Sequence, residues 1–151
     1  MFLRLQGIEG ESTDKGHPKE IVVLSYSFGI GPFPEGPIAN RPCESLDVVK
    51  NLDKASPKLM QVARTGAHIP TGVLAFTRTA AGPVDFYRIE ITNIAVSMVA
   101  QSGATGAAMP VEAVTLRART YKVSYKALGR DGELDRIAFE FGWDCLTNRQ
   151  L

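Results

Sequence analysis

The chain reads GIEGESTDKGHPKEIVVLSYSFG over residues 7–29, and this stretch changes from a turn-rich segment into an alternating one. Residues 7–19 hold three glycines and Pro18, a composition typical of a loop. From residue 20 to residue 29, apolar side chains recur at every second position, which predicts a β-strand. Its two faces carry Val22, Leu24, Tyr26 and Phe28 on one side, and Ile21, Val23, Ser25 and Ser27 on the other. We therefore expect a loop that leads into a long strand.

The same alternation recurs along the rest of the chain. It predicts strands over residues 2–6, 45–52, 71–78, 84–100, 111–126 and 135–144. One helix of about ten residues is predicted from Ser56, which suits the N-cap, with Pro57 at the first helical position and Gly66 after the last turn. Six or seven strands with one short helix indicate an all-β (mainly β) fold.

Two of the long strands change their apolar face partway along. In residues 84–100 the apolar parity slips near Thr92 or Asn93, and in residues 111–126 it slips between Leu116 and Tyr121. Because register fixes the face of a strand, each slip predicts a β-bulge or a bend. We therefore expect a closed or strongly curved antiparallel β-barrel or sandwich, and the barrel is favoured.

Length and composition are those of an ordinary globular domain. The 151 residues fit one domain, residues 1–151, and 44% are hydrophobic while 22% are charged. The formal net charge of +1 gives no basic surface for nucleic acid or anionic lipid. The longest nearly apolar run, residues 94–100, is too short to insert across a membrane. No Sec-type signal peptide precedes the first predicted strand, so any export is expected to use another route.

Few residues offer chemistry. Ser12 and Lys15 match the S-x-x-K spacing of some acyl-transfer enzymes, but they lie in a predicted loop instead of at a helix start. The two histidines, His17 and His68, have no ligand neighbours at metal-binding spacing, so turn or capping roles are expected for both. We therefore expect no enzyme, and no catalytic residue, metal or cofactor.

Several segments resemble the Hcp family (haemolysin-coregulated protein), which forms tubes in bacterial type VI secretion. The most specific match is G-I-x-G-E-S-x-D-x-x-H at residues 7–17, followed by I-x-V-L-S-Y-S-x-G at residues 21–29. Further similarity lies, in the family order, at residues 53–59, 66–68, 112–116 and 142–144. The residues of this chain that match the family motifs, all expected to be structural, are Gly10, Glu11, Ser12, Asp14, His17, Ser25, Ser27, Gly29, Ser56, Pro57, His68 and Trp143.

The resemblance implies a fold similar to that of phage tail-tube proteins and a function in assembly. In such a family, six identical subunits form a ring, and the rings stack into the inner tube that a contractile sheath drives outward. The implied partners are therefore copies of this chain, the type VI sheath and spike, and small effectors carried in the ring lumen. The implied localisation is cytoplasmic when assembled, followed by secretion through the type VI apparatus.

A proline-rich segment departs from the family pattern. Many relatives carry a glycine-rich loop with a tryptophan at this point, which would touch the next ring. The corresponding residues here, predicted to form a ring-stacking or interface loop, are Gly31, Pro32, Phe33, Pro34, Glu35, Gly36, Pro37, Ile38, Ala39, Asn40, Arg41 and Pro42. Proline cannot donate to a sheet ladder, so this segment is not expected to be a central strand. The alternative function is a binding or adaptor module that uses the loop at 31–42 to hold a partner without forming a tube.

Overall fold

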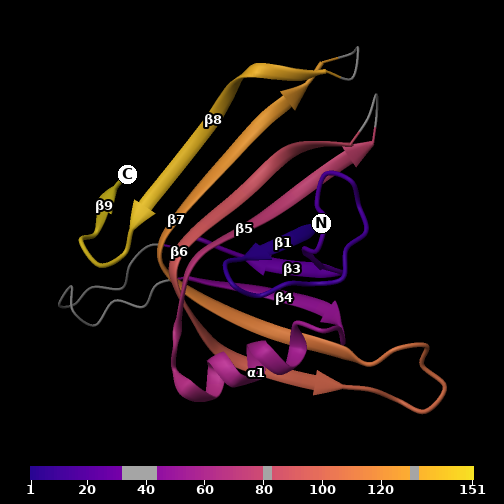
Figure 1. Ribbon diagram of the computed structural model, residues 1–151. Helices are drawn as coiled ribbons and strands as arrows, with labels where there is room; N and C mark the ends of the chain where they lie inside the picture. The colour runs from indigo at the N-terminus through magenta and orange to yellow at the C-terminus, as the bar shows by residue number, and fades with distance from the viewer. Residues whose placement is uncertain (32–43, 80–82, 130–132) are drawn as a thin grey trace.

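One antiparallel sheet of nine strands makes up most of the molecule, and α1 (Ser56–Thr65) lies against it (Figure 1). The computed structural model describes residues 1–31, 44–79, 83–129 and 133–151. The strands are β1 (Phe2–Leu5), β2 (Ile21–Val22), β3 (Ser25–Phe28), β4 (Ser45–Asn51), β5 (His68–Thr79), β6 (Pro83–Ser102), β7 (Val111–Leu128), β8 (Leu134–Asp144) and β9 (Arg149–Gln150). Six of the predicted strands are confirmed within three residues at each end, whereas two-residue β9 is too short to show periodicity.

The sheet is strongly curved. Its strand order is β2-β1-β5-β6-β7-β4-β3, with β8 paired to β7 and β9 paired to β8. The two ends of this order, β2 and β3, follow one another in the chain but form no ladder together in the described part of the sheet. The curved, open form of the predicted fold is therefore the one observed, and the hydrogen-bonded ladder does not close into a barrel.

The stretch over residues 20–29 forms two strands, not the single strand that its alternation predicted. Its backbone changes partner in the middle: the Val23 N–H donates to Met1 O at 3.0 Å, and the Leu24 N–H donates to Val49 O at 2.8 Å. The inward parity also differs between the two strands, because in β3 Phe28 is half-buried while Ser25 and Ser27 are exposed. Ile21 and Val23 are buried, whereas Val22 and Leu24 are about half exposed. A change of partner strand thus overrides the local period of two.

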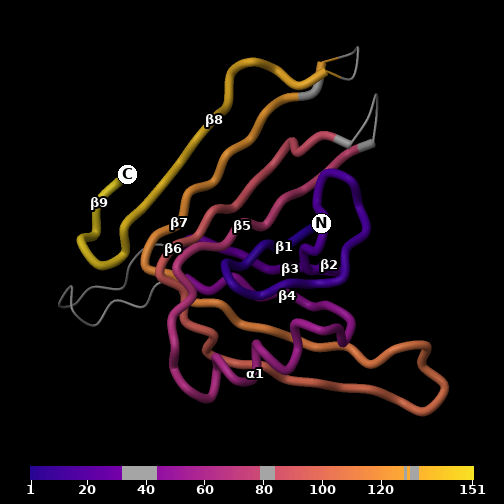
Figure 2. The backbone as a smooth tube through the Cα atoms, in the orientation of Figure 1, coloured from indigo at the N-terminus to yellow at the C-terminus, as the bar shows by residue number. Residues whose placement is uncertain are grey.

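The three longest central strands bend at neighbouring positions (Figure 2). Thr92 of β6 pairs with Thr71 of β5 and with Thr120 of β7, so the bends lie side by side across the sheet. Asn93 takes a left-handed backbone conformation with φ of 50°, which asparagine tolerates better than most residues. Residues buried on both sides of the bend are Ile69 and Leu74 in β5, Ile91 and Ile94 in β6, and Ala118 and Tyr121 in β7. Both predicted changes of face are confirmed.

The helix ends as predicted but begins differently. Gly66 has φ of 70°, and its N–H donates to Val62 O at 3.0 Å, as expected for a glycine at the helix end. At the start, Ala55 occupies the N-cap position, and no side chain caps the helix. The predicted N-cap, Ser56, is instead buried, and its Oγ accepts a hydrogen bond from Lys50 Nζ at 3.0 Å. The Ser56 hydroxyl, which was expected to cap the helix, therefore accepts a hydrogen bond from the buried Lys50 ammonium instead.

Candidate functional site

The opening motif, which spans residues 7–17, lies in the loop between β1 and β2. Gly10 is buried, and its N–H donates to Lys19 O at 2.7 Å. An added Cβ at this position would stand 2.5 Å from Ile21 Cα and closer still to Glu20 O, so only glycine fits against this backbone. Glu11 Oε1 accepts the Lys54 N–H at 3.0 Å, which fastens the loop to the segment before α1. The loop is thus a structural strap, hereafter the N-terminal strap (residues 7–20).

His17 fastens the other end of the N-terminal strap. Its Nδ1 lies 2.9 Å from Glu20 Oε2, and its Nε2 lies 2.9 Å from Asp85 Oδ1 of β6. The ring is buried and stacks on Phe2 with 4.5 Å between the ring centroids. A turn or capping role was predicted for His17, and its partner Asp85 could not be predicted, because no local pattern links positions 68 residues apart. The two carboxylates contact opposite nitrogens of one ring, so they share no common ligand position.

The S-x-x-K match does not form a catalytic arrangement. Ser12 is buried, and its Oγ accepts the Asp14 N–H at 3.2 Å. Asp14 in turn accepts the Gly16 N–H at 2.8 Å through Oδ1. These short-range hydrogen bonds are those of a turn, in which Ser and Asp side chains satisfy nearby backbone groups. Lys15 lies exposed outside this turn.

A charged cluster that sequence analysis missed lies buried beneath the start of α1. The Lys50 side chain is 1% exposed, and its Nζ lies 2.7 Å from Asp53 Oδ1 and 3.2 Å from Glu112 Oε2. Glu112 pairs with Lys50 across β4 and β7, and its Oε1 accepts a hydrogen bond from Gln101 Nε2 at 2.8 Å. A buried ammonium is tolerated only when paired and hydrogen-bonded. This cluster therefore joins β4, β7 and the start of α1.

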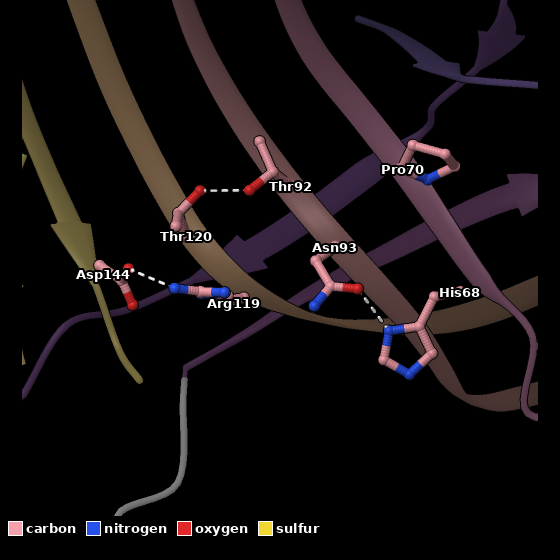
Figure 3. A pocket seen from close by; sticks show the side chains of 7 residues that line it. All are labelled: His68, Pro70, Thr92, Asn93, Arg119, Thr120 and Asp144. Carbon is pink, nitrogen blue, oxygen red and sulfur yellow. Dashed lines mark hydrogen bonds and ion pairs between the residues drawn. The ribbon is translucent and has the colours of Figure 1, made fainter. Parts of the chain in front are cut away.

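A shallow pocket lined by residues with polar side chains and by Pro70 lies where the sheet bends (Figure 3). Its volume is about 440 Å³, and its lining residues are His68, Pro70, Thr92, Asn93, Arg119, Thr120 and Asp144. Figure 3 shows three pairs of polar side chains across neighbouring strands: His68 with Asn93, Thr92 with Thr120, and Arg119 with Asp144. Each of these six side chains thus has at least one hydrogen-bond partner within the pocket. The three pairs join β5 to β6, β6 to β7 and β7 to β8 at the bend.

Asp144 carries the clearest electrostatic perturbation at this bend. The hydrogen bond from Arg119 Nη2, at 3.1 Å, is the main reason that the pKa of its carboxyl lies below the ordinary value. The Thr147 and Leu146 N–H groups also donate to Oδ1 and lower this pKa further. These bonds fix the turn between β8 and β9, so the perturbed carboxylate has a structural explanation.

Four further family-motif positions lie on or next to two strands, β3 and β8. Ser25, Ser27 and Gly29 are exposed on or just after β3, whereas Trp143 is half-buried on β8. Of the predicted interface loop, Gly31 is exposed, and Pro32 to Pro42 lie outside the described residues. Across residues 1–31, 44–79, 83–129 and 133–151, no three His, Cys, Asp or Glu residues are placed to hold a metal ion. The described helix is also not long and apolar enough to cross a membrane.

Comparison with known proteins identifies the protein family. The family described as "Type VI secretion system effector, Hcp" matches residues 2–125. Protein hcp1 of Pseudomonas aeruginosa is 31% identical, and the match covers 99% of this chain and 97% of that protein. The crystal structure of Hcp1 from Salmonella typhimurium superposes with a TM-score of 0.83 at 28% identity, covering 99% of this chain and 96% of that one. A solved type six secretion system protein gives a TM-score of 0.86 at 28% identity, covering 99% and 98% of the two chains.

Proposed function

The chain belongs to the Hcp family of type VI secretion proteins, and from this premise we propose that it is a structural subunit of the secretion tube. Six copies would form a ring, and the rings would stack into the tube that the type VI apparatus exports. The observation that carries this proposal is the match over nearly the whole chain to Hcp relatives in both sequence and fold. We take residues 1–151 as a single tube domain, in keeping with a sheet that runs from β1 to β9.

The geometry is in keeping with a structural role instead of an enzymatic one. The polar side chains that stand out are engaged with one another: His17 with Glu20 and Asp85, and Lys50 with Asp53 and Glu112. These contacts stabilise the fold and leave no activated nucleophile beside a base in the described part of the chain. We therefore propose that the protein acts through its surfaces, which would meet other copies, the sheath and the spike, and would enclose small effectors in the lumen.

The native mass tests this proposal. Light scattering behind a sizing column, in reducing buffer, should give a mass near six times 16.4 kDa, and projection images should show a ring with a central hole. A mass of one subunit at tens of micromolar protein would contradict ring formation. It would favour the adaptor function, in which the loop at residues 31–42 holds a different partner.

The loop at residues 31–42 is proposed to make the contact between stacked rings. Deleting residues 33–38 should leave the ring mass unchanged but abolish stacked filaments at high protein concentration, because in the proposed tube the loop would meet the next ring and not the neighbour within a ring. Sedimentation of filaments and electron micrographs would measure both effects. Filaments that persist after the deletion would exclude this loop as the stacking element.

A further inference from the structure

The His17 ring of the N-terminal strap faces a carboxylate at each of its two nitrogens. Nδ1 lies 2.9 Å from Glu20 Oε2, and Nε2 lies 2.9 Å from Asp85 Oδ1. An ionised carboxylate can only accept hydrogen bonds, so each contact needs a hydrogen on the ring nitrogen that faces it. A neutral imidazole carries one such hydrogen, whereas the charged imidazolium carries two. The geometry therefore fits the protonated ring.

The hydroxyl of Thr77 on β5 gives separate evidence for the hydrogen on Nε2. Thr77 Oγ1 donates its single hydrogen to Asp85 Oδ1 at 3.0 Å. The same Oγ1 lies 3.2 Å from His17 Nε2, and with its hydrogen already used it can only accept there. Nε2 thus faces two acceptors and has to carry a hydrogen. The contact between Nδ1 and Glu20 then requires a second hydrogen on the same ring.

Burial makes the charge of this ring important. The side chains of His17, Glu20 and Asp85 are 9%, 12% and 27% exposed. In the described part of the chain, His17 is the one side chain able to be cationic that pairs with either carboxylate. Its ring also stacks on Phe2 of β1 at an interplanar angle of 6°, and an aromatic face attracts a cation. Without the second hydrogen, a bare nitrogen would face a carboxylate oxygen, and both carboxylates would lack a cation.

We propose that His17 is a proton-dependent latch, which holds the N-terminal strap on the sheet while its ring is protonated and loosens the strap when the ring loses that proton. The latch joins the strap to three strands, through Phe2 on β1, Thr77 on β5 and Asp85 on β6. Because the docked strap holds the charged ring, this stabilisation is present at low pH and is lost as the pH rises. All of these groups belong to one chain, so the latch does not depend on the proposed ring of subunits.

Urea unfolding at about pH 5.5 and about pH 8.5, on either side of the range in which histidine changes charge, tests the latch. His68 is the matched control, because it is the second of two histidines, is exposed, and contacts Asn93 through Nδ1 alone. In the wild type and in His68→Gln, the equilibrium constant for unfolding should rise at least about tenfold at the higher pH, as expected for the loss of one charge-assisted hydrogen bond. In His17→Gln, whose amide does not titrate, this rise should be absent. An equal rise in all three proteins would overturn the inference.

A measurement on the wild type does not depend on how well a variant folds. Long-range ¹H–¹⁵N NMR spectra distinguish a histidine ring with two protonated nitrogens from a ring with one, and hydrogen exchange measures how firmly the strap is docked. After correction for the intrinsic effect of pH on exchange, the protection of the Gly10, Ser12 and Lys19 amides should fall as His17 loses its second ring proton. A strap that keeps its protection after that proton is lost would overturn the inference.

Discussion

Replacing Lys50 with methionine is expected to lower the free energy of unfolding by about 3–5 kcal/mol, because it leaves a buried carboxylate without its cation. Glu112 is 0% exposed, and Lys50 Nζ lies 3.2 Å from its Oε2. Once the ammonium is gone, Glu112 Oε1 still accepts the hydrogen bond from Gln101 Nε2, but no cation faces Oε2. Urea unfolding followed by tryptophan fluorescence would measure the change, with Trp143 as the natural probe.

Two matched variants separate the effect of burial from the loss of a charge. Lys54→Met removes a lysine whose side chain is 45% exposed and whose Nζ lies 3.2 Å from Glu9 Oε2. An exposed pair of this kind contributes about 0–1 kcal/mol, so this variant should unfold nearly like the wild type. The double variant Lys50→Met with Glu112→Leu should recover much of the lost stability, since the fully buried carboxylate is removed together with its cation. The remaining partner of Lys50, Asp53, is 11% exposed and still accepts the Ala55 N–H. If Lys50→Met and Lys54→Met lowered the free energy of unfolding equally, the buried cluster would contribute no more to stability than a surface ion pair.

Gly10→Ala is expected to destabilise the protein by about 3 kcal/mol, near the upper end of the cost of forcing an extra carbon into a packed site. The added Cβ would lie 2.5 Å from Ile21 Cα and from Ile21 N. These are backbone atoms of the strand that β1 pairs with, so they cannot rotate away as a side chain can. The N-terminal strap would have to lift from the sheet, which would also strain the contact between His17 and Asp85.

Gly29→Ala is the matched control for this substitution. An added Cβ at Gly29 meets no heavy atom within 4 Å, and its φ lies outside the left-handed region. Alanine there is expected to be neutral or slightly stabilising, by about 0.4–1 kcal/mol, because it restricts the unfolded chain. Thermal unfolding of the two variants would compare them directly. A Gly10→Ala protein as stable as Gly29→Ala would mean that the strap is not packed as closely as its backbone contacts indicate.

The sequence alone determined the elements of this fold and where its long strands bend. Alternation of apolar residues is a local property, and it located six of the strands. The helix end at Gly66 and the change of face near Asn93 could also be predicted, because each depends on the conformation of a few adjacent residues. The family motifs of the N-terminal strap were visible for the same reason, since they are short and contiguous.

Only the tertiary structure decided which of these residues meet. The sequence around Lys50 alternates apolar and polar residues, which is typical of a strand with one solvent-exposed face. Its burial depends on Glu112, which is 62 positions away in the chain. The pairing of His17 with Asp85 and the change of partner strand at Val23 are equally non-local. The alternation of β8 predicted one apolar face but not that Ile137 and Phe139 on this face would be exposed among the described residues. The partners of a side chain depend on how strands pack against one another across the sheet. A local period of two does not say which strand will lie against a given face.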